Sequence, residues 1–138
     1  MRIFLDANIL FGAAHNPKGK AALIIEIGRN GVWQVATSPY AAEEARRNVA
    51  RKFPACVERL EALLGEVRLV ADAPGVPAPA GLAAKDAPIF RAAVSCRADV
   101  LLTGDIRDFG FLMNAPDNAD GLLSQTVADF LAGREPPG

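Results

Sequence analysis

The sequence predicts an α/β domain with a mostly parallel central sheet. Short apolar segments with strand-forming residues alternate with longer segments of helical spacing, and this order is typical of parallel sheets. The chain has 138 residues, about the length of one domain, with 51% hydrophobic and 22% charged residues. It can therefore bury a core, and we expect a single domain over residues 1–132 and a flexible tail over 133–138.

The chain is expected to begin with a strand, a helix and a second strand. Residues 2–5 are short, mostly apolar and followed at once by Asp6, as in a strand buried on both faces of a sheet. A helix over 18–30 shows apolar residues at helical spacing and ends at an Asn-Gly stop. The β propensity of residues 32–36, which include two valines and a tryptophan, predicts the second strand.

Capping and breaking residues mark the next three elements. A serine followed by a proline at the first helical position begins a helix over 39–53. Pro54 ends that helix, and an amphipathic helix over 55–64 stops at a glycine. Residues 66–70 then predict the third strand.

The last third of the chain begins with a loop. Three prolines and two glycines within residues 71–81 are loop chemistry, and too little chain remains on either side for this segment to be a domain linker. Residues 84–97 are helical by composition, and 99–103 predict a fourth strand. A final strand over 121–123 and a helix over 125–131 complete the expected order.

Charge and cysteine content narrow the class of protein. Fifteen Lys and Arg balance sixteen Asp and Glu for a net charge of −1, so the strongly basic footprint of a nucleic-acid coat protein is missing. Cys56 and Cys96 lie far apart in a chain that shows no secretory signal, so we expect reduced cysteines and a cytoplasmic location. The longest apolar run, 21–27, is too short for a membrane span, so no membrane partner is expected.

Acidic residues from distant parts of the chain are expected to meet at one edge of the sheet. Parallel strands all end at the same edge, and the helix after each strand begins there. An acid follows the first strand and another follows the fourth, and further acids lie near the starts of the helices that follow the second and third strands. The residues are Asp6, Glu43, Glu44, Asp86, Asp105 and Asp108.

Two physical explanations fit these carboxylates. Helix capping and the helix macrodipole favour acids near helix N-termini by roughly 0.3–1 kcal/mol each, which is enough to explain Asp86 or Asp108 taken alone. Capping explains Asp6 less well, because Asn8 is available as a cap. Three or more carboxylates at one edge would repel and raise one another's pKa values unless a cation lies among them. A divalent metal is the simplest such cation.

The available donor atoms favour Mg²⁺ or Mn²⁺ as that metal. Carboxylate oxygens suit these ions better than they suit zinc. Zinc is further disfavoured because His15 is the only histidine and the two cysteines lack C-x-x-C spacing. A single histidine in a polar turn also argues against a His-activated nucleophile, and no glycine-rich nucleotide-binding motif occurs.

Four motifs, taken in order, resemble the PIN-domain family over nearly the whole chain. They are Leu5-Asp6-Ala7-Asn8-Ile9-Leu10, Ser38-Pro39 with Glu44 downstream, Lys85-Asp86, and Val100-Leu101-Leu102-Thr103-Gly104-Asp105. The resemblance implies a doubly wound, three-layer α/β/α sandwich and an Mg²⁺- or Mn²⁺-dependent ribonuclease. Many small members of that family are toxins neutralised by an antitoxin, and members often dimerise. An RNA substrate, an antitoxin partner and a homodimer are therefore what the resemblance implies here.

The resemblance also assigns roles by position in the motifs. Four residues look like the catalytic acids of the family: Asp6, Glu44, Asp86 and Asp105. Three of them, Asp6, Asp86 and Asp105, would hold the metal, and Glu44 would be a further ligand or a base that orients water. Three more residues would have supporting roles: Asn8, Thr103 and Asp108.

The Glu43-Glu44 doublet leaves the second acid ambiguous by one position. We choose Glu44, because Ala41, Ala45 and Val49 at four-residue spacing suit the buried face of the same helix. Glu44 then lies on another stripe of that helix.

Arg47 and Arg51 share the stripe of Glu44 and are candidates for binding an RNA backbone beside the metal. A solvated helix face is the simpler explanation for any one of these arginines. Trp33, Tyr40 and most of the phenylalanines are expected in the core, so base stacking is not predicted.

Two other functions fit a small α/β domain with acids at one edge. A phosphoacceptor module of receiver type is the first, although such modules need an acidic pair before the first helix, and Asp6 stands alone. A non-catalytic binding module that keeps the fold and the acids is the second, and composition does not exclude it.

Overall fold

A computed structural model describes residues 1–105, 107–116 and 121–134 of the chain. Its centre is a five-stranded sheet in the order β3-β2-β1-β4-β5, in which every strand pair is parallel. The predicted α/β class is confirmed. The strands are β1 (Arg2–Leu5), β2 (Gln34–Thr37), β3 (Arg68–Leu69), β4 (Val100–Leu102) and β5 (Leu123–Gln125).

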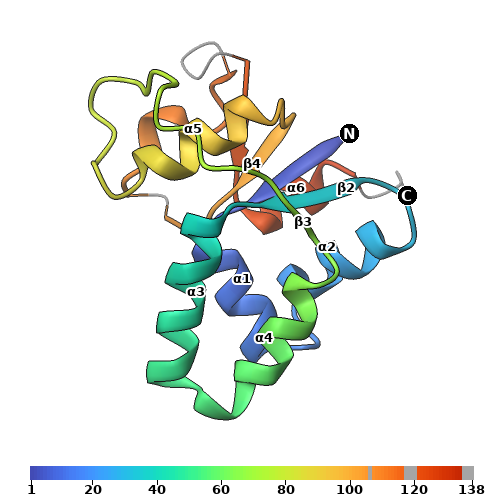
Figure 1. Ribbon diagram of the computed structural model, residues 1–138. Coiled ribbons are helices and arrows are strands. Elements are labelled where there is room, and N and C mark those ends of the chain that lie inside the picture. Colours follow the sequence, from blue (N-terminus) through green and yellow to red (C-terminus); the bar gives the residue numbers. More distant parts are fainter. Residues whose placement is uncertain (106, 117–120, 135–138) are drawn as a thin grey trace.

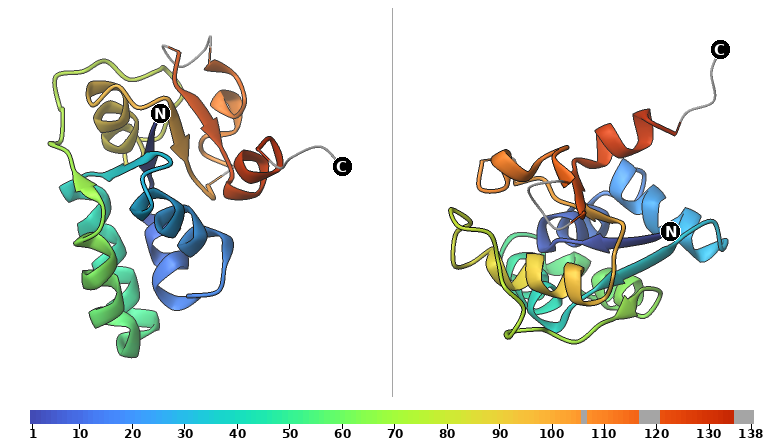
Figure 2. Two further views of the ribbon diagram at one scale, coloured as in Figure 1. Left: turned by 90° about the vertical axis from the view of Figure 1, so that its right-hand side faces the viewer. Right: turned by 90° about the horizontal axis from the view of Figure 1, so that it is seen from above.

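Helices cover both faces of this sheet, so the expected three-layer sandwich is confirmed. The chain moves outward from β1 to β3 and then returns to β4, so right-handed crossovers place α1–α4 on one face and α5 on the other. Figure 1 shows α5 above the sheet and α1, α3 and α4 below it, and Figure 2 shows α6 beside α2. The helices are α1 (Ala7–His15), α2 (Lys20–Arg29), α3 (Pro39–Lys52), α4 (Val57–Leu64), α5 (Ala87–Ser95) and α6 (Val127–Ala132).

The central strand β1 is buried on both faces. Ile3, Phe4 and Leu5 have no exposed surface, and Phe4 lies opposite Ala36 of β2 and Leu101 of β4. This burial explains why the strand shows a continuous apolar run instead of alternating polarity. The side chains expected in the core are largely there: Trp33 and four phenylalanines (Phe4, Phe90, Phe109 and Phe130) are buried.

The edge strand β3 is shorter than predicted. Of the expected 66–70 only Arg68–Leu69 pairs, with β2 alone, and both residues are exposed. The helix expected over 55–64 is divided into a 3-10 turn, η1 (Pro54–Cys56), followed by α4, because the proline that ends α3 also begins the turn. The other predicted elements are present, with ends that differ by a few residues.

Helix α1 was not predicted, and it begins directly after β1. Asn8 and Gly12 lower its helix propensity, and its nine residues give little periodicity to detect. Its N-cap is Asp6, whose Oδ1 accepts a 2.6 Å hydrogen bond from the amide of Ala7. The suggestion that Asn8 is available as the cap is therefore wrong, because only Asp6 separates the strand from the helix and Asn8 already lies inside α1.

The strand order also contradicts the receiver-type alternative. Receiver-type domains share the flavodoxin-like order 2-1-3-4-5, whereas this sheet has the order β3-β2-β1-β4-β5.

The C-terminal end of the described chain packs on the domain. Gly133 caps α6, and the guanidinium of Arg134 lies 4.2 Å from the centre of the Phe130 ring. Residues 135–138 of the predicted tail lie outside the described residues. In the described part of the chain, no helix combines the length and the apolar character that a bilayer crossing requires.

Candidate metal centre

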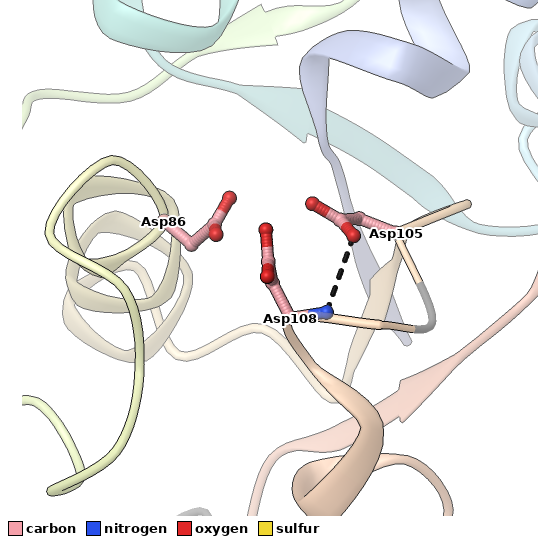
Figure 3. A group of neighbouring side chains, drawn as sticks. All are labelled: Asp86, Asp105 and Asp108. Carbon is pink, nitrogen blue, oxygen red and sulfur yellow. Dashed lines mark hydrogen bonds between the residues drawn. The ribbon is translucent and has the colours of Figure 1, made fainter.

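Three carboxylates meet where β4 ends and α5 begins. Asp86, Asp105 and Asp108 each place one oxygen within 4.8 Å of the oxygens of the other two. Figure 3 shows the three side chains pointing toward one another, with the Asp108 amide donating a 3.2 Å hydrogen bond to Asp105 Oδ1. Residues from two segments about twenty positions apart in the chain thus form one group, which we call the three-carboxylate cluster.

Lys85 supplies positive charge to this cluster. Its Nζ lies 3.2 Å from Oδ2 of Asp86, 3.2 Å from Oδ2 of Asp105 and 2.6 Å from Oδ2 of Asp108. The side chain is 61% exposed, so it reaches the acids from the solvent side. The ammonium lowers the pKa of Asp108, and the three carboxylates raise the pKa of Lys85. Sequence reasoning inferred that a cation must lie among the acids but did not identify this lysine.

Asp86 is the most buried member of the cluster, at 6% exposure. It precedes α5 at the N-cap position, yet its side chain makes no capping hydrogen bond. Pro88 in the first turn of α5 has no amide hydrogen to donate, which removes one donor that a cap would use. Among the described residues, Asp86 Oδ2 accepts no hydrogen bond and is paired with the Lys85 ammonium through charge, at 3.2 Å. Burial raises the pKa of the carboxyl, and Lys85 partly offsets this. Hydrogen-bonded capping therefore does not explain this acid.

Asp6 lies beside the cluster, at the end of the neighbouring strand β1. It is 4% exposed, and burial is the main reason that its pKa rises to about 6. Hydrogen bonds from Thr103 and Ala7 oppose this rise, and the charges of Glu44 and Asp86 add to it. The carboxyls of Asp6, Glu44 and Asp86 are thus electrostatically coupled, as expected for acids at one sheet edge.

Two polar residues join the ends of β1 and β4. The Thr103 hydroxyl donates to Asp6 Oδ2 at 2.8 Å and accepts from the amide of Asp105 at 3.0 Å. Asn8 accepts from the amide of Gly104 at 2.8 Å, and its Nδ2 lies 3.4 Å from Asp6 Oδ2. These contacts fix the relative positions of Asp6 and Asp105.

The two glutamates of α3 face different surroundings. Glu44 is half-buried and raises the pKa of Asp6 and of Tyr40, whereas Glu43 is exposed. Glu43 belongs instead to the surroundings of Arg46, whose pKa is raised first by its hydrogen bond to Glu61 and to a lesser extent by Glu43.

Tyr40 was expected in the core, but its hydroxyl group contacts the segment that carries Lys85 and Asp86. It is only partly buried, and its hydroxyl donates a 2.9 Å hydrogen bond to the carbonyl of Lys85. Burial and the charges of Glu44 and Asp86 raise its pKa, and Arg47 and Lys85 partly offset this. The first turn of α3 is thereby tied to the segment that carries two members of the site.

The two candidate RNA-binding arginines are exposed on α3. Arg47 lies close enough to Tyr40 to affect its pKa, and Arg51 Nη2 donates to Asn48 Oδ1 at 3.2 Å. The structure therefore places Arg47 near Tyr40 and Arg51 further along the helix.

The donor set fits a hard divalent cation. All candidate ligand atoms are carboxylate oxygens, and one of them, Asp86 Oδ2, is buried with the Lys85 ammonium as its charged partner. The cluster contains Asp86 and Asp105, which were predicted as ligands, and Asp108, which was predicted as a supporting acid. Asp6 lies outside the 4.8 Å group and reaches it through Thr103.

A parallel α/β/α sandwich with carboxylates gathered at the carboxyl edge defines a class of fold that binds its ligand at that edge. The family model described as PIN domain matches residues 2–107, and the chain belongs to this family of nucleases. A comparison with curated proteins finds no match.

Two solved structures share the fold. One is VapBC2 from Rickettsia felis bound to a DNA fragment from its promoter, with 16% identity, a TM-score of 0.66, and coverage of 91% of this chain and 98% of that chain. The other is VapBC-1 from nontypeable Haemophilus influenzae, with 16% identity, a TM-score of 0.56, and coverage of 93% and 99%.

Proposed function

We propose that this protein is a metal-dependent endoribonuclease that hydrolyses RNA phosphodiester bonds at the three-carboxylate cluster. The observation that carries the proposal is the buried Asp86, which does not cap its helix, lies against Asp105 and Asp108, and has the exposed Lys85 ammonium as the cation paired with its Oδ2. Maintaining such a group costs stability, and functional sites are where such costs are commonly found.

Asp86, Asp105 and Asp108 would hold Mg²⁺ or Mn²⁺, with Asp6 as a fourth acid connected through Thr103. Bound there, the ion would polarise a phosphoryl oxygen and lower the pKa of an attacking water. Glu44 is either a further ligand or a base that orients this water. With a metal held there, the carboxylates would no longer need Lys85 for neutralisation, and the lysine would be free to contact the RNA phosphate.

Arg47 and Arg51 would hold the RNA backbone on the side of α3. Arg47 lies beside Tyr40 and Glu44, so a phosphate next to the scissile one would meet its guanidinium. The overall charge of −1 makes such local contacts necessary, since the protein has no general attraction for polyanions.

We further propose that the protein is the toxin of a toxin–antitoxin pair and acts in the cytoplasm. The support is the PIN family match and the likeness to VapBC structures, in which a PIN toxin is paired with an antitoxin. Free Cys56 and Cys96 agree with a reducing compartment. A short reading frame directly upstream that encodes a DNA-binding antitoxin would support this role. The implied homodimer is tested separately, by measuring the molecular mass of the purified protein in solution.

The direct test of the enzymatic proposal is cleavage of single-stranded RNA with Mn²⁺ or Mg²⁺. Cleavage is expected to stop with EDTA and to fall by orders of magnitude in Asp105→Asn and Asp6→Asn. Asp129→Asn, an exposed acid in the first turn of α6, is the matched control and should cleave normally. Cleavage that survives in both site variants would assign the activity to a contaminant. A protein that binds the metal but cleaves no RNA would be the non-catalytic module.

A further inference from the structure

A groove of about 280 Å³ lies between α1 and α3, next to the candidate metal centre. Figures 1 and 2 show the two helices side by side, running away from the sheet edge that carries the acids. The groove adjoins the site, because one of its lining residues, Asn8, also contacts Asp6 and Gly104. Its other lining residues are Phe11, Asn48 and Lys52.

Aromatic rings continue from the groove toward the ends of the two helices. The ring centre of Phe11 is 4.9 Å from that of His15 and 5.6 Å from that of Phe53, and His15 and Phe53 are 4.7 Å apart. Phe53 is 42% exposed and His15 is also exposed, so ring surface is available to a ligand. Two exposed rings packed on the partly buried Phe11 form an aromatic surface of the kind that often marks a binding site.

Positive charge borders the same rings. Lys52 Nζ lies 5.7 Å from the ring centre of Phe11, and Arg51 is held against Asn48 by a 3.2 Å hydrogen bond. Among the residues that the structure describes, none of those lining the groove is acidic. Flat rings next to cations are the combination with which proteins bind single-stranded nucleic acids, because bases stack on the rings and phosphates pair with the cations.

We propose that this groove binds a nucleobase and the adjoining phosphate of the RNA strand whose scissile phosphate lies at the three-carboxylate cluster. The proposal rests on the proposed ribonuclease function. A volume of about 280 Å³ falls below the range of drug-sized pockets and suits a single ring system. The rings of Phe11 and Phe53 would stack on the base, and the amide of Asn48 would hydrogen-bond to its edge. The ammonium of Lys52 would pair with the phosphate that adjoins this base.

The lining favours a base over a protein segment. An amphipathic helix would need a continuous apolar groove, whereas Phe11 is the one apolar residue among the four described residues that line this groove. A protein partner is therefore an outcome that the test must be able to detect.

The test measures binding of a fluorescent single-stranded oligoribonucleotide by anisotropy, in the inactive Asp105→Asn background. Phe53→Leu keeps an apolar side chain but removes the ring, and it should weaken binding by at least about fivefold, the lower end of base stacking. Lys52→Ala should weaken binding and reduce its salt dependence. Val32→Ala and Lys20→Ala change an exposed apolar residue and a lysine away from the groove, and they should bind normally.

An abasic oligonucleotide with the same phosphates separates stacking from charge. The Phe53→Leu effect should disappear with this probe, and the Lys52→Ala effect should remain. The proposal is overturned if Phe53→Leu binds the RNA as the parent does, or if it weakens the abasic probe equally. A Phe53→Leu chain that binds RNA normally but changes its oligomeric state would assign the rings to a protein contact instead. Cleavage by the otherwise unmodified chain, measured separately, shows whether the ribonuclease proposal stands when this one fails.

Discussion

The hydroxyl of Thr103 donates a 2.8 Å hydrogen bond to Oδ2 of Asp6. The hydroxyl oxygen of Thr103 also accepts a hydrogen bond from the amide of Asp105, so this one side chain connects acids that follow two neighbouring strands. Thr103 is fully buried, so water does not replace either bond. The relative position of Asp6 and the three-carboxylate cluster therefore depends on this hydroxyl.

Thr103→Val should lower the free energy of unfolding by about 1–3 kcal/mol, because it leaves the Asp105 amide and the Asp6 carboxyl without their buried partner. It should also weaken Mn²⁺ binding. Thr37→Val is the matched control, since Thr37 is equally buried but donates to the carbonyl of Leu5 instead of an acid. Urea unfolding should show a loss of stability in both variants, and calorimetric titration should show weaker Mn²⁺ binding only in Thr103→Val.

The raised pKa of Asp6 predicts a specific pH dependence without metal. The folded protein holds the Asp6 proton up to about pH 6, whereas the unfolded chain releases it near its ordinary value of 3.8. Between these values the folded state binds more protons, so this group makes stability fall as pH rises from about 4 to 6.

Asp6→Asn removes that titration and keeps an N-cap side chain. In EDTA its unfolding free energy, relative to the parent chain, should rise by up to about 3 kcal/mol between pH 4 and pH 7.5. Urea unfolding at the two pH values measures the difference. If the difference in unfolding free energy between Asp6→Asn and the parent is the same at pH 4 and at pH 7.5, Asp6 does not titrate in this range.

Lys85→Met should lower the melting temperature without metal and increase the stabilisation by Mn²⁺. The lysine relieves repulsion among three carboxylates, but it is largely exposed, so we expect a loss of only about 1 kcal/mol. In Lys85→Met, Mn²⁺ would not have to compete with the lysine ammonium for the three carboxylates, so it should bind more tightly. Lys18→Met is the control, and thermal melts with and without Mn²⁺ provide both values. An unchanged Mn²⁺ shift would mean that Lys85 and the ion do not share the cluster.

Tyr40→Phe should lower the unfolding free energy by about 1 kcal/mol, the usual value for one hydrogen bond. The larger expected effect is local: without the bond to the Lys85 carbonyl, the segment before α5 is held less firmly. Hydrogen exchange should then be faster over 83–87 than in the parent protein. Faster exchange spread over the whole chain would indicate a global effect instead.

The fold was largely predictable, because each buried strand is a short apolar run and parallel strands end at one edge. Asp6 and Asp105 could be placed there for that reason. Helix α1 escaped prediction because it is short and begins directly after β1, and β3 was overestimated because edge pairing leaves little pattern.

The contacts within the site were less predictable than its location. Lys85 is adjacent to Asp86 in sequence, but its contacts with Asp105 and Asp108 depend on the packing of α5 against the end of β4. The Tyr40 hydroxyl bond likewise follows from the position of α3 and not from any local pattern.

The most direct measurement of the central claim is calorimetric titration of Mn²⁺ into the parent chain and into Asp86→Asn, with Asp129→Asn as control. The carboxylates of Asp86, Asp105 and Asp108 are expected to bind the ion, and Asp86→Asn is expected to weaken that binding by at least about tenfold. Absence of binding at millimolar Mn²⁺, or equal affinity in Asp86→Asn and the parent, would contradict the account.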